Sequence, residues 1–225
     1  MFARYLLIAG FVAVAMPWTA RAEEAVKIGN AYALLNKPAS PQVGLILIPG
    51  GDGVMNIKAD GTFSSGKNNQ LVRTRQAYLA HGIATLTIDV DVDVPSAVNY
   101  MRKLAPVVVV AGTSRGSLRV PNSLPAKPNA IVLTAAMLKE VRSSVGSPSA
   151  LPPTLLVHHR KDQCRVTLPD AVEPFKTWGG AKVQVVWLQG GVTAGNDCGA
   201  QAYHGFNGID AAVVSTVAQF ANSVK

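Results

Sequence analysis

Short apolar runs recur along the chain, and between them apolar residues repeat at helical spacing. The runs lack the strict alternation of apolar and polar residues that marks half-exposed strands, so they predict strands buried on both faces of a sheet. Strands that alternate with helices favour an α/β fold in which a mostly parallel central sheet is covered by helices on both faces. Residues 26–35 are expected to hold one or two strands, and the other expected strands are residues 43–49, 83–90, 106–111, 130–135, 154–158 and 182–188. The expected helices are residues 70–81, 95–104 and 209–224.

Capping residues set the expected helix boundaries. Gly82 follows the first helical pattern as a C-terminal stop, Pro95 lies in the first turn of the second, and Asn207 is the expected N-cap of the last. Residues 136–153, between two expected strands, leave no room for a folded lid domain. In α/β sheets of this kind, ligands bind beyond the carboxyl ends of the strands.

The N-terminal segment is typical of a targeting sequence. Arg4 precedes an apolar core at residues 6–16, and residues 20–22 (ARA) have the small side chains of a cleavage site. The sequence therefore predicts a signal peptide over residues 1–22 and a single domain over residues 23–225. The apolar core is too short to favour an uncleaved membrane anchor, which is the alternative. We expect an exported protein, periplasmic or extracellular, without stable membrane insertion.

Composition narrows the class of function. The 225 residues are 48% apolar and 15% charged, which suits a full-sized core and excludes a disordered chain. The 21 Lys and Arg residues exceed the 13 Asp and Glu residues, for a formal net charge of +8. The basic residues are scattered, without a basic helix or zinc-finger spacing, so we expect no nucleic-acid partner. The net positive charge is explained equally well by a mild positive electrostatic field that attracts anions.

A candidate nucleophile follows the most strand-like run, residues 106–111 (PVVVVA). Residues 112–116 (GTSRG) form a G-x-S-x-G sequence between that strand and a helical start, the context in which this motif positions a catalytic serine. The sharp turn strains the backbone of Ser114, presses the two glycines against neighbouring strands and points the hydroxyl beyond the sheet at a helix N-terminus. A glycine-rich turn with a solvent-facing serine is the alternative. Ser117 is expected to be an ordinary helix residue.

Two loops are expected to supply N–H groups for an oxyanion hole. Residues 50–53 (GGDG) end the strand at residues 43–49, and glycine lets the chain approach an acyl oxygen closely. We expect the N–H of Gly51, with Asp52 as the next candidate, to pair with the N–H of Arg115. Gly-Asp-Gly also favours tight turns, so a simple turn is the alternative.

A serine nucleophile needs an imidazole to take its proton and a carboxylate to orient the imidazole. Asp162 follows a strand and is the expected acid, with Glu140 as the alternative. His204 lies in the long loop before the last helix and is the expected base. The chain order Ser114, Asp162, His204 is the order expected for such a triad on this architecture.

The other titratable residues have structural interpretations. His81 is expected at the surface, and His158 and His159 are expected to pack against or shape the loop of the acid. Three aspartates alternate at a strand exit, where polar residues are common; a cation site is the alternative. They are Asp89, Asp91 and Asp93. We expect no metal and no cofactor.

Cys164 and Cys198 are the only cysteines. An even pair in an exported protein is usually a disulfide, which stabilises a fold by about 4 kcal/mol for a loop of this length in the chain-entropy model. A metal pair is the alternative, but no histidine stands at ligand spacing. Because Cys164 closely follows Asp162 and Cys198 closely precedes His204, a bridge would tie the loop of the acid to the loop of the base.

With these residues in place, the chain resembles the serine-type α/β-hydrolase superfamily. It is similar to exported bacterial members with a GTSRG elbow, a VHHxxDxC acid loop and a C…HGF base loop, here residues 112–116, 157–164 and 198–206. The resemblance covers nearly all of residues 23–225. It implies a mixed sheet of the α/β-hydrolase fold, a Ser-His-Asp triad and hydrolysis of esters or related acyl bonds. It implies little about the substrate, because this fold carries many activities.

Two features depart from that pattern. The stretch 89–104 is short, so a loop that often shapes the pocket is shorter here. Three prolines follow the elbow, so the helix there must be short or kinked. Neither removes a triad member. The sequence therefore predicts an exported serine hydrolase that acts on a small-molecule acyl substrate. A non-catalytic exported binding protein on the same scaffold is the alternative, and a Cys- or metal-dependent hydrolase fits less well because the elbow holds serine.

Overall fold

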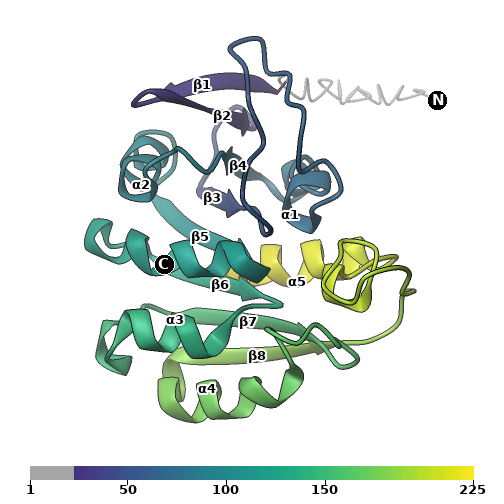
Figure 1. The fold of residues 1–225 in the computed structure, drawn as a ribbon. Coiled ribbons are helices and arrows are strands. Elements are labelled where there is room, and N and C mark those ends of the chain that lie inside the picture. Colours follow the sequence, from purple (N-terminus) through teal and green to yellow (C-terminus); the bar gives the residue numbers. More distant parts are fainter. Residues whose placement is uncertain (1–22) are drawn as a thin grey trace, which may run out of the picture.

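The structure is a computed structural model that describes residues 23–225, so the predicted signal peptide lies outside the described residues. Eight strands form one sheet in the order β1-β2-β4-β3-β5-β6-β7-β8 (Figure 1). The strands are β1 (Glu24–Ile28), β2 (Ala31–Asn36), β3 (Val43–Ile48), β4 (Ile83–Ile88), β5 (Val107–Thr113), β6 (Ala130–Thr134), β7 (Thr154–His159) and β8 (Val183–Leu188). β1 pairs with β2 and β2 with β4 in antiparallel register, and every other pair is parallel.

Helices cover both faces of this sheet (Figure 1). The α-helices are α1 (Gln70–Arg73), α2 (Val94–Arg102), α3 (Leu138–Val145), α4 (Val172–Gly179) and α5 (Asp210–Ser223). The 3₁₀ helices are η1 (Ala77–His81), η2 (Ser114–Ala126), η3 (Pro148–Ala150), η4 (Pro169–Ala171), η5 (Gly180–Lys182) and η6 (Tyr203–Gly205). Among these helices of residues 23–225, none is long and apolar enough to cross a membrane.

Alternate residues of the central strands enter two separate cores. In β5, Val108 and Val110 pack in the core that contains the apolar residues of α2, α3 and α4. Val109 and Ala111 face the other side, where α5 and Leu71 of α1 pack. Every residue of β3, β4, β6 and β7 is buried, including Thr85 and Thr87 of β4, so these strands have no solvent-exposed face.

Two local expectations differ from the structure, and a third agrees with it. The helix expected over residues 70–81 is split into α1 and η1, because the backbone turns after Arg73. The segment after Ser114 is a 3₁₀ helix that contains Pro121 and Pro125, in keeping with the expected interruption of a regular α-helix. The expected Asn207 cap is wrong: Ile209 is the N-cap of α5, and the Asn207 side chain instead donates to the Gln201 carbonyl at 2.9 Å.

The parallel strands all end at one edge of the sheet, and the loops that follow them meet there. The elbow (residues 112–116) follows β5, the acid loop (residues 160–168) follows β7, and the base loop (residues 189–208) follows β8. The loop at residues 49–69 follows β3. This edge therefore collects the segments that carry the candidate catalytic residues.

Candidate active site

Ser114 sits at a strained turn between β5 and η2. Its φ of 50° lies in the left-handed region that non-glycine residues rarely occupy. Gly116 meets the end of β3: a Cβ built there would lie 2.5 Å from the Ile48 carbonyl oxygen and would also clash with that of Pro49. A Cβ at Gly112 would lie 2.9 Å from the Ser117 Cα. Both glycines of the motif are thus required by close approach of the backbone.

Ser117 has a role at the elbow that its sequence position did not indicate. It is fully buried, and its hydroxyl donates to the Ser114 carbonyl at 2.6 Å. The Ser117 hydroxyl oxygen also accepts the N–H of Met137, just after β6, at 3.1 Å. Ser117 therefore links the strained turn to the neighbouring strand connection.

Asp162 is held rigidly in the acid loop. Its side chain is buried; Oδ1 accepts the Cys164 N–H at 2.9 Å, and Oδ2 accepts the Thr167 hydroxyl at 3.0 Å. Oδ2 also lies 3.0 Å from Nδ1 of His204. The alternative acid, Glu140, is on the exposed side of α3.

His204 lies in η6 with only 5% of its surface exposed. The Asp162 carboxylate can only accept at Nδ1, which requires the proton on Nδ1 and leaves the lone pair on Nε2. Gly205 next to it is packed against Ala200, where a Cβ would clash with the Ala200 backbone. The loop can therefore take this path only with glycine after His204.

The base loop is anchored by Arg73 of α1. The guanidinium donates to the Gly205 carbonyl at 2.7 Å and the Ala200 carbonyl at 3.4 Å, and it forms a bidentate ion pair with Asp210 at 2.7 and 2.8 Å. Arg73 thus binds backbone carbonyls on both sides of His204. Sequence analysis missed this residue because its partners lie more than a hundred positions away.

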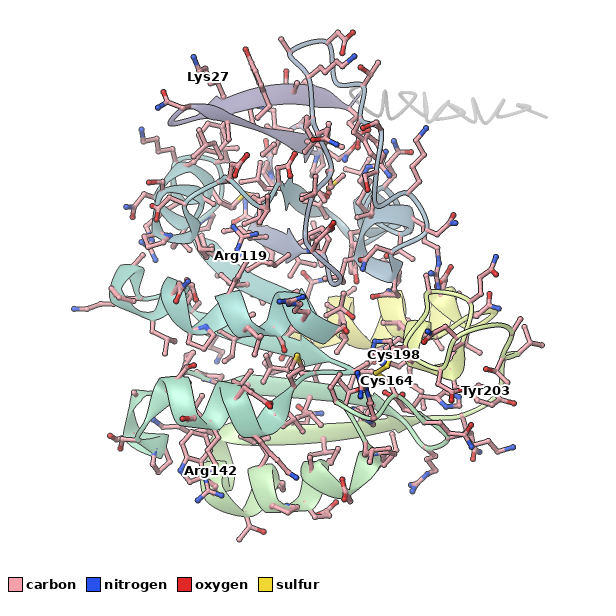
Figure 2. All side chains as sticks on the ribbon, in the orientation of Figure 1. Lys27, Arg119, Arg142, Cys164, Cys198 and Tyr203 are labelled. Carbon is pink, nitrogen blue, oxygen red and sulfur yellow. A yellow bond between two sulfur atoms is a disulfide. The ribbon has the colours of Figure 1, made fainter. Side chains whose placement is uncertain are left out.

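The predicted disulfide between Cys164 and Cys198 is present and joins the acid loop to the base loop (Figure 2). The Cα atoms are 4.5 Å apart, although 34 positions separate the residues in the sequence. Because the Cys164 N–H also binds Asp162, the bridge connects the carboxylate loop directly to the segment that leads into His204.

Two further histidines pack beside these loops, as expected. His159 stacks on Tyr203 with ring centroids 4.6 Å apart; its Nε2 lies 3.0 Å from the Gly190 carbonyl, and its Nδ1 accepts the Lys161 N–H. His158 is fully buried, with Nε2 3.5 Å from Asp162 Oδ2. Burial lowers the pKa of His158 to about 4, against the opposing effect of the Asp162 charge. His158 is therefore a neutral residue of the core.

Ser114 and His204 line one small cavity of about 50 Å³. Among the described residues, no hydrogen bond joins Ser114 Oγ to His204; such contacts are commonly loose before substrate binds. The other lining residues come from the loop after β3, α1, the elbow and the base loop. They are Gly51, Asn69, Gln70, Thr113, Cys198, Ala200 and Gly205.

The candidate oxyanion donors lie on both sides of Ser114. Gly51 has φ of 70° and lines the cavity, and a Cβ at the preceding Gly50 would lie 2.9 Å from the Ser114 Cβ. Arg115 follows Ser114 at the start of η2, where the first N–H groups of a helix lack intrahelical partners. Asp52, the second oxyanion candidate, has a carboxylate that accepts the Val54 N–H at 3.0 Å, as in a turn.

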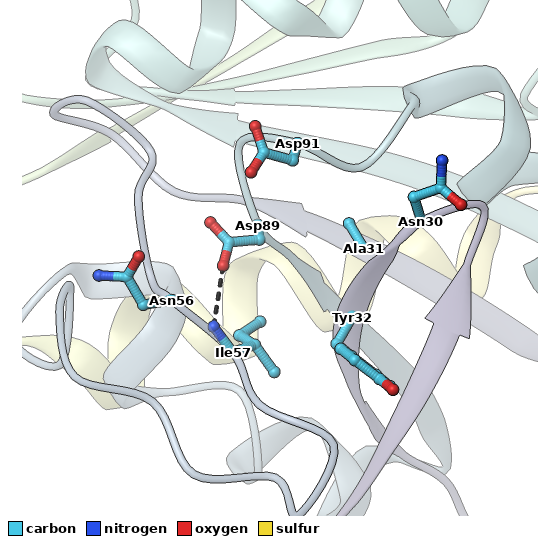
Figure 3. A pocket seen from close by; sticks show the side chains of 7 residues that line it. All are labelled: Asn30, Ala31, Tyr32, Asn56, Ile57, Asp89 and Asp91. Atoms are coloured by element: carbon cyan, nitrogen blue, oxygen red, sulfur yellow. Dashed lines mark hydrogen bonds between the residues drawn. The ribbon is translucent and has the colours of Figure 1, made fainter.

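A larger cavity of about 440 Å³ lies elsewhere, between the β1–β2 turn, residues 56–57 and the end of β4 (Figure 3). Its buried carboxylate, Asp89, accepts the N–H groups of Met55, Ile57 and Val90 at 2.8 to 3.0 Å, so it shapes the loop. Asp93 caps α2 through the Ser96 N–H. Within residues 23–225, no group of three or more His, Cys, Asp or Glu side chains is arranged to hold a metal ion.

No family model and no curated protein matches the chain. Solved structures do resemble it. An α/β serine hydrolase homologue from Coxiella burnetii aligns with a TM-score of 0.62 and 15% identity, over 90% of this chain and 98% of that chain. A serine hydrolase without a lid from Xanthomonas campestris gives 0.60 and 14%, over 93% and 100%. An esterase domain from Rhodothermus marinus gives 0.64 and 13%, over 90% and 98%.

At these identities the likeness establishes the fold. The chain has the α/β-hydrolase fold, with a mostly parallel eight-stranded sheet, which confirms the fold predicted from the sequence.

Proposed function

We propose that this protein is an exported serine hydrolase that cleaves carboxylic esters of small acyl groups. Ser114 is the nucleophile, His204 the general base and acid, and Asp162 the residue that orients His204. The observation that carries the proposal is the buried contact of 3.0 Å between Asp162 Oδ2 and His204 Nδ1, in a structure where His204 and Ser114 line one cavity.

The first half-reaction acylates the serine. His204 Nε2 takes the proton of Ser114 Oγ as the oxygen attacks the ester carbonyl. The carbonyl oxygen becomes an oxyanion, which the N–H groups of Gly51 and Arg115 stabilise. The C–O bond then breaks, and the alcohol leaves with the proton from His204. Asp162 stays ionised throughout and stabilises the imidazolium.

The second half-reaction regenerates the enzyme. His204 Nε2 takes a proton from water, which attacks the acyl carbon, and the same N–H groups hold the second oxyanion. Ser114 Oγ then leaves the acyl carbon and recovers its proton from His204. No group beyond the chain and water is needed to balance either step.

The small cavity supports short acyl groups as substrates. Its volume of about 50 Å³ is several times the roughly 10–15 Å³ that a cavity needs to hold one water, so it has room for a small acyl group such as acetyl. An ester is favoured over an amide because an alkoxide leaves more readily than an amide anion. The likeness in fold to an esterase domain supports this class of substrate.

Hydrolysis of p-nitrophenyl acetate by the purified protein tests the proposal. We expect Ser114→Ala and His204→Gln to lower kcat by a factor on the order of 10⁴ or more, whereas Ser96→Ala, an exposed serine on α2, leaves it unchanged. Wild-type protein without esterase activity, or Ser114→Ala with normal activity, would refute the assignment.

Export is supported by residues 1–22 of the sequence and by the disulfide, which persists in oxidising compartments. Intact-mass measurement of the protein recovered from the periplasm or medium tests this part. A mass that corresponds to residues 23–225 with the disulfide formed supports export. A mass that corresponds to a chain with residues 1–22 still attached argues against it.

A further inference from the structure

The hydroxyl of Thr167 touches both the carboxylate and the imidazole of the proposed triad. Thr167 Oγ1 lies 3.0 Å from Asp162 Oδ2 and 3.0 Å from His204 Nδ1. The side chain is buried, with 1% of the residue exposed. Asp162 Oδ2, Thr167 Oγ1 and His204 Nδ1 therefore form a closed triangle of polar atoms without solvent between them.

Counting protons in this triangle fixes the role of each atom. An ionised carboxylate only accepts, and Thr167 has one proton to donate, so the hydroxyl donates to Asp162 Oδ2. His204 Nδ1 must then be the second donor, shared between Asp162 Oδ2 and the free lone pairs of Thr167 Oγ1. This arrangement places the remaining imidazole lone pair on Nε2, the atom that the proposed reaction needs.

The opposite tautomer of His204 would form fewer hydrogen bonds within the same triangle. With the proton on Nε2, the bare Nδ1 and Asp162 Oδ2 would compete for the single Thr167 proton, so one of these two buried acceptors would have no donor in the triangle. A buried acceptor without a hydrogen bond is unfavourable, so the triangle selects the productive tautomer. It also prevents Asp162 from rotating away from His204, because Oδ1 is held by the Cys164 N–H.

We propose that Thr167 is a positioning residue that holds Asp162 and selects the reactive tautomer of His204. The inference rests on the proposed serine hydrolase function. Thr167 touches neither substrate nor the attacked carbonyl in this scheme, so its effect passes entirely through Asp162 and His204.

The backbone at this position does not depend on the hydroxyl. The Thr167 N–H donates to the Cys164 carbonyl at 2.9 Å, and the disulfide holds Cys164. Thr167→Val keeps the branched shape and loses only the hydroxyl, whereas Thr167→Ser keeps the hydroxyl and loses a methyl group. The two substitutions separate hydrogen bonding from packing at one site.

The test measures kcat and KM for p-nitrophenyl acetate in both variants, with far-UV circular dichroism and thermal unfolding to compare folding. We expect Thr167→Val to lower kcat about 10-fold with KM unchanged, since a hydrogen bond to a charged group is lost. Thr167→Ser should stay within about threefold of wild type. Equal activity of Thr167→Val and wild type, or equal losses in both variants, would overturn the proposal.

A double-mutant cycle separates positioning from a general structural effect. If Thr167 acts through Asp162, Thr167→Val should have little further effect on kcat in an Asp162→Asn background. The same 10-fold loss in both backgrounds would overturn the proposal. These outcomes are distinct from failure of the proposed function, in which wild-type protein itself would lack serine-dependent esterase activity.

Discussion

Cys164 and Cys198 join the two loops that carry the proposed acid and base. Asp162 accepts the N–H of Cys164, and His204 lies in the same loop as Cys198. The disulfide thus lies at the proposed catalytic site, rather than in a part of the fold distant from it. Its loss should alter both stability and catalysis.

Replacing both cysteines in Cys164→Ser/Cys198→Ser tests this dual role. Removing a cross-link over 34 positions should lower the free energy of unfolding by about 4 kcal/mol in the chain-entropy model. We expect kcat/KM for p-nitrophenyl acetate to fall as well, under conditions where circular dichroism shows a folded protein. Unchanged kcat/KM in the folded double variant would show that the bridge does not hold the catalytic loops.

His158 should make stability depend on pH. Its pKa is about 4 in the folded protein, lowered by burial, and about 6.5 when exposed in the unfolded chain. The unfolded chain therefore binds a proton first as pH falls, so stability is lost between pH 6.5 and 4. The contribution of this residue is about 3 kcal/mol over that interval.

Urea unfolding between pH 7 and pH 4 measures the effect. His158→Gln should show a weaker loss of stability with falling pH than wild type, whereas His81→Gln, at an exposed histidine, should keep the wild-type slope. The same slope in His158→Gln and wild type would contradict the assignment of a buried neutral imidazole.

Arg73 should stabilise the base loop through its hydrogen bonds to the carbonyls on both sides of His204. We expect Arg73→Met to cost about 1–3 kcal/mol of unfolding free energy and to lower kcat/KM as well. Arg102→Met is the matched control, because Arg102 also donates to two carbonyls, those of Ala126 and Lys127, away from the site. If the two variants change kcat/KM equally, Arg73 has no special role at the base.

Gln70 forms part of the cavity wall beside Ser114 and should limit the length of the acyl group. The Gln70→Ala substitution enlarges the cavity, so the ratio of kcat/KM for p-nitrophenyl butyrate to that for acetate should rise about 10-fold. Gln219→Ala, at an exposed position on α5, is the control and should leave the ratio unchanged. A wild-type preference for octanoate over acetate would contradict the short-acyl proposal.

Local signals in the sequence predicted much of the fold and the candidate residues. The strands were recognisable because their burial on both faces requires continuous apolar runs. The elbow was recognisable because its glycines and serine are adjacent, and the strain at Ser114 arises within a single turn.

Contacts between distant segments explain what the sequence did not reveal. The helix at 70–81 breaks where the Arg75 side chain pairs with Glu23 and its carbonyl accepts the Thr85 hydroxyl on β4. Thr167 has no motif of its own, and only the folded loops bring it to His204. Such roles depend on side chains far apart in the sequence.

Covalent labelling with a fluorophosphonate, mapped by peptide mass spectrometry, tests the central claim most directly. The account predicts a single adduct on Ser114 in wild-type protein, much slower labelling in His204→Gln, and no adduct in Ser114→Ala. An adduct on another residue, or labelling of Ser114→Ala at the wild-type rate, would contradict it.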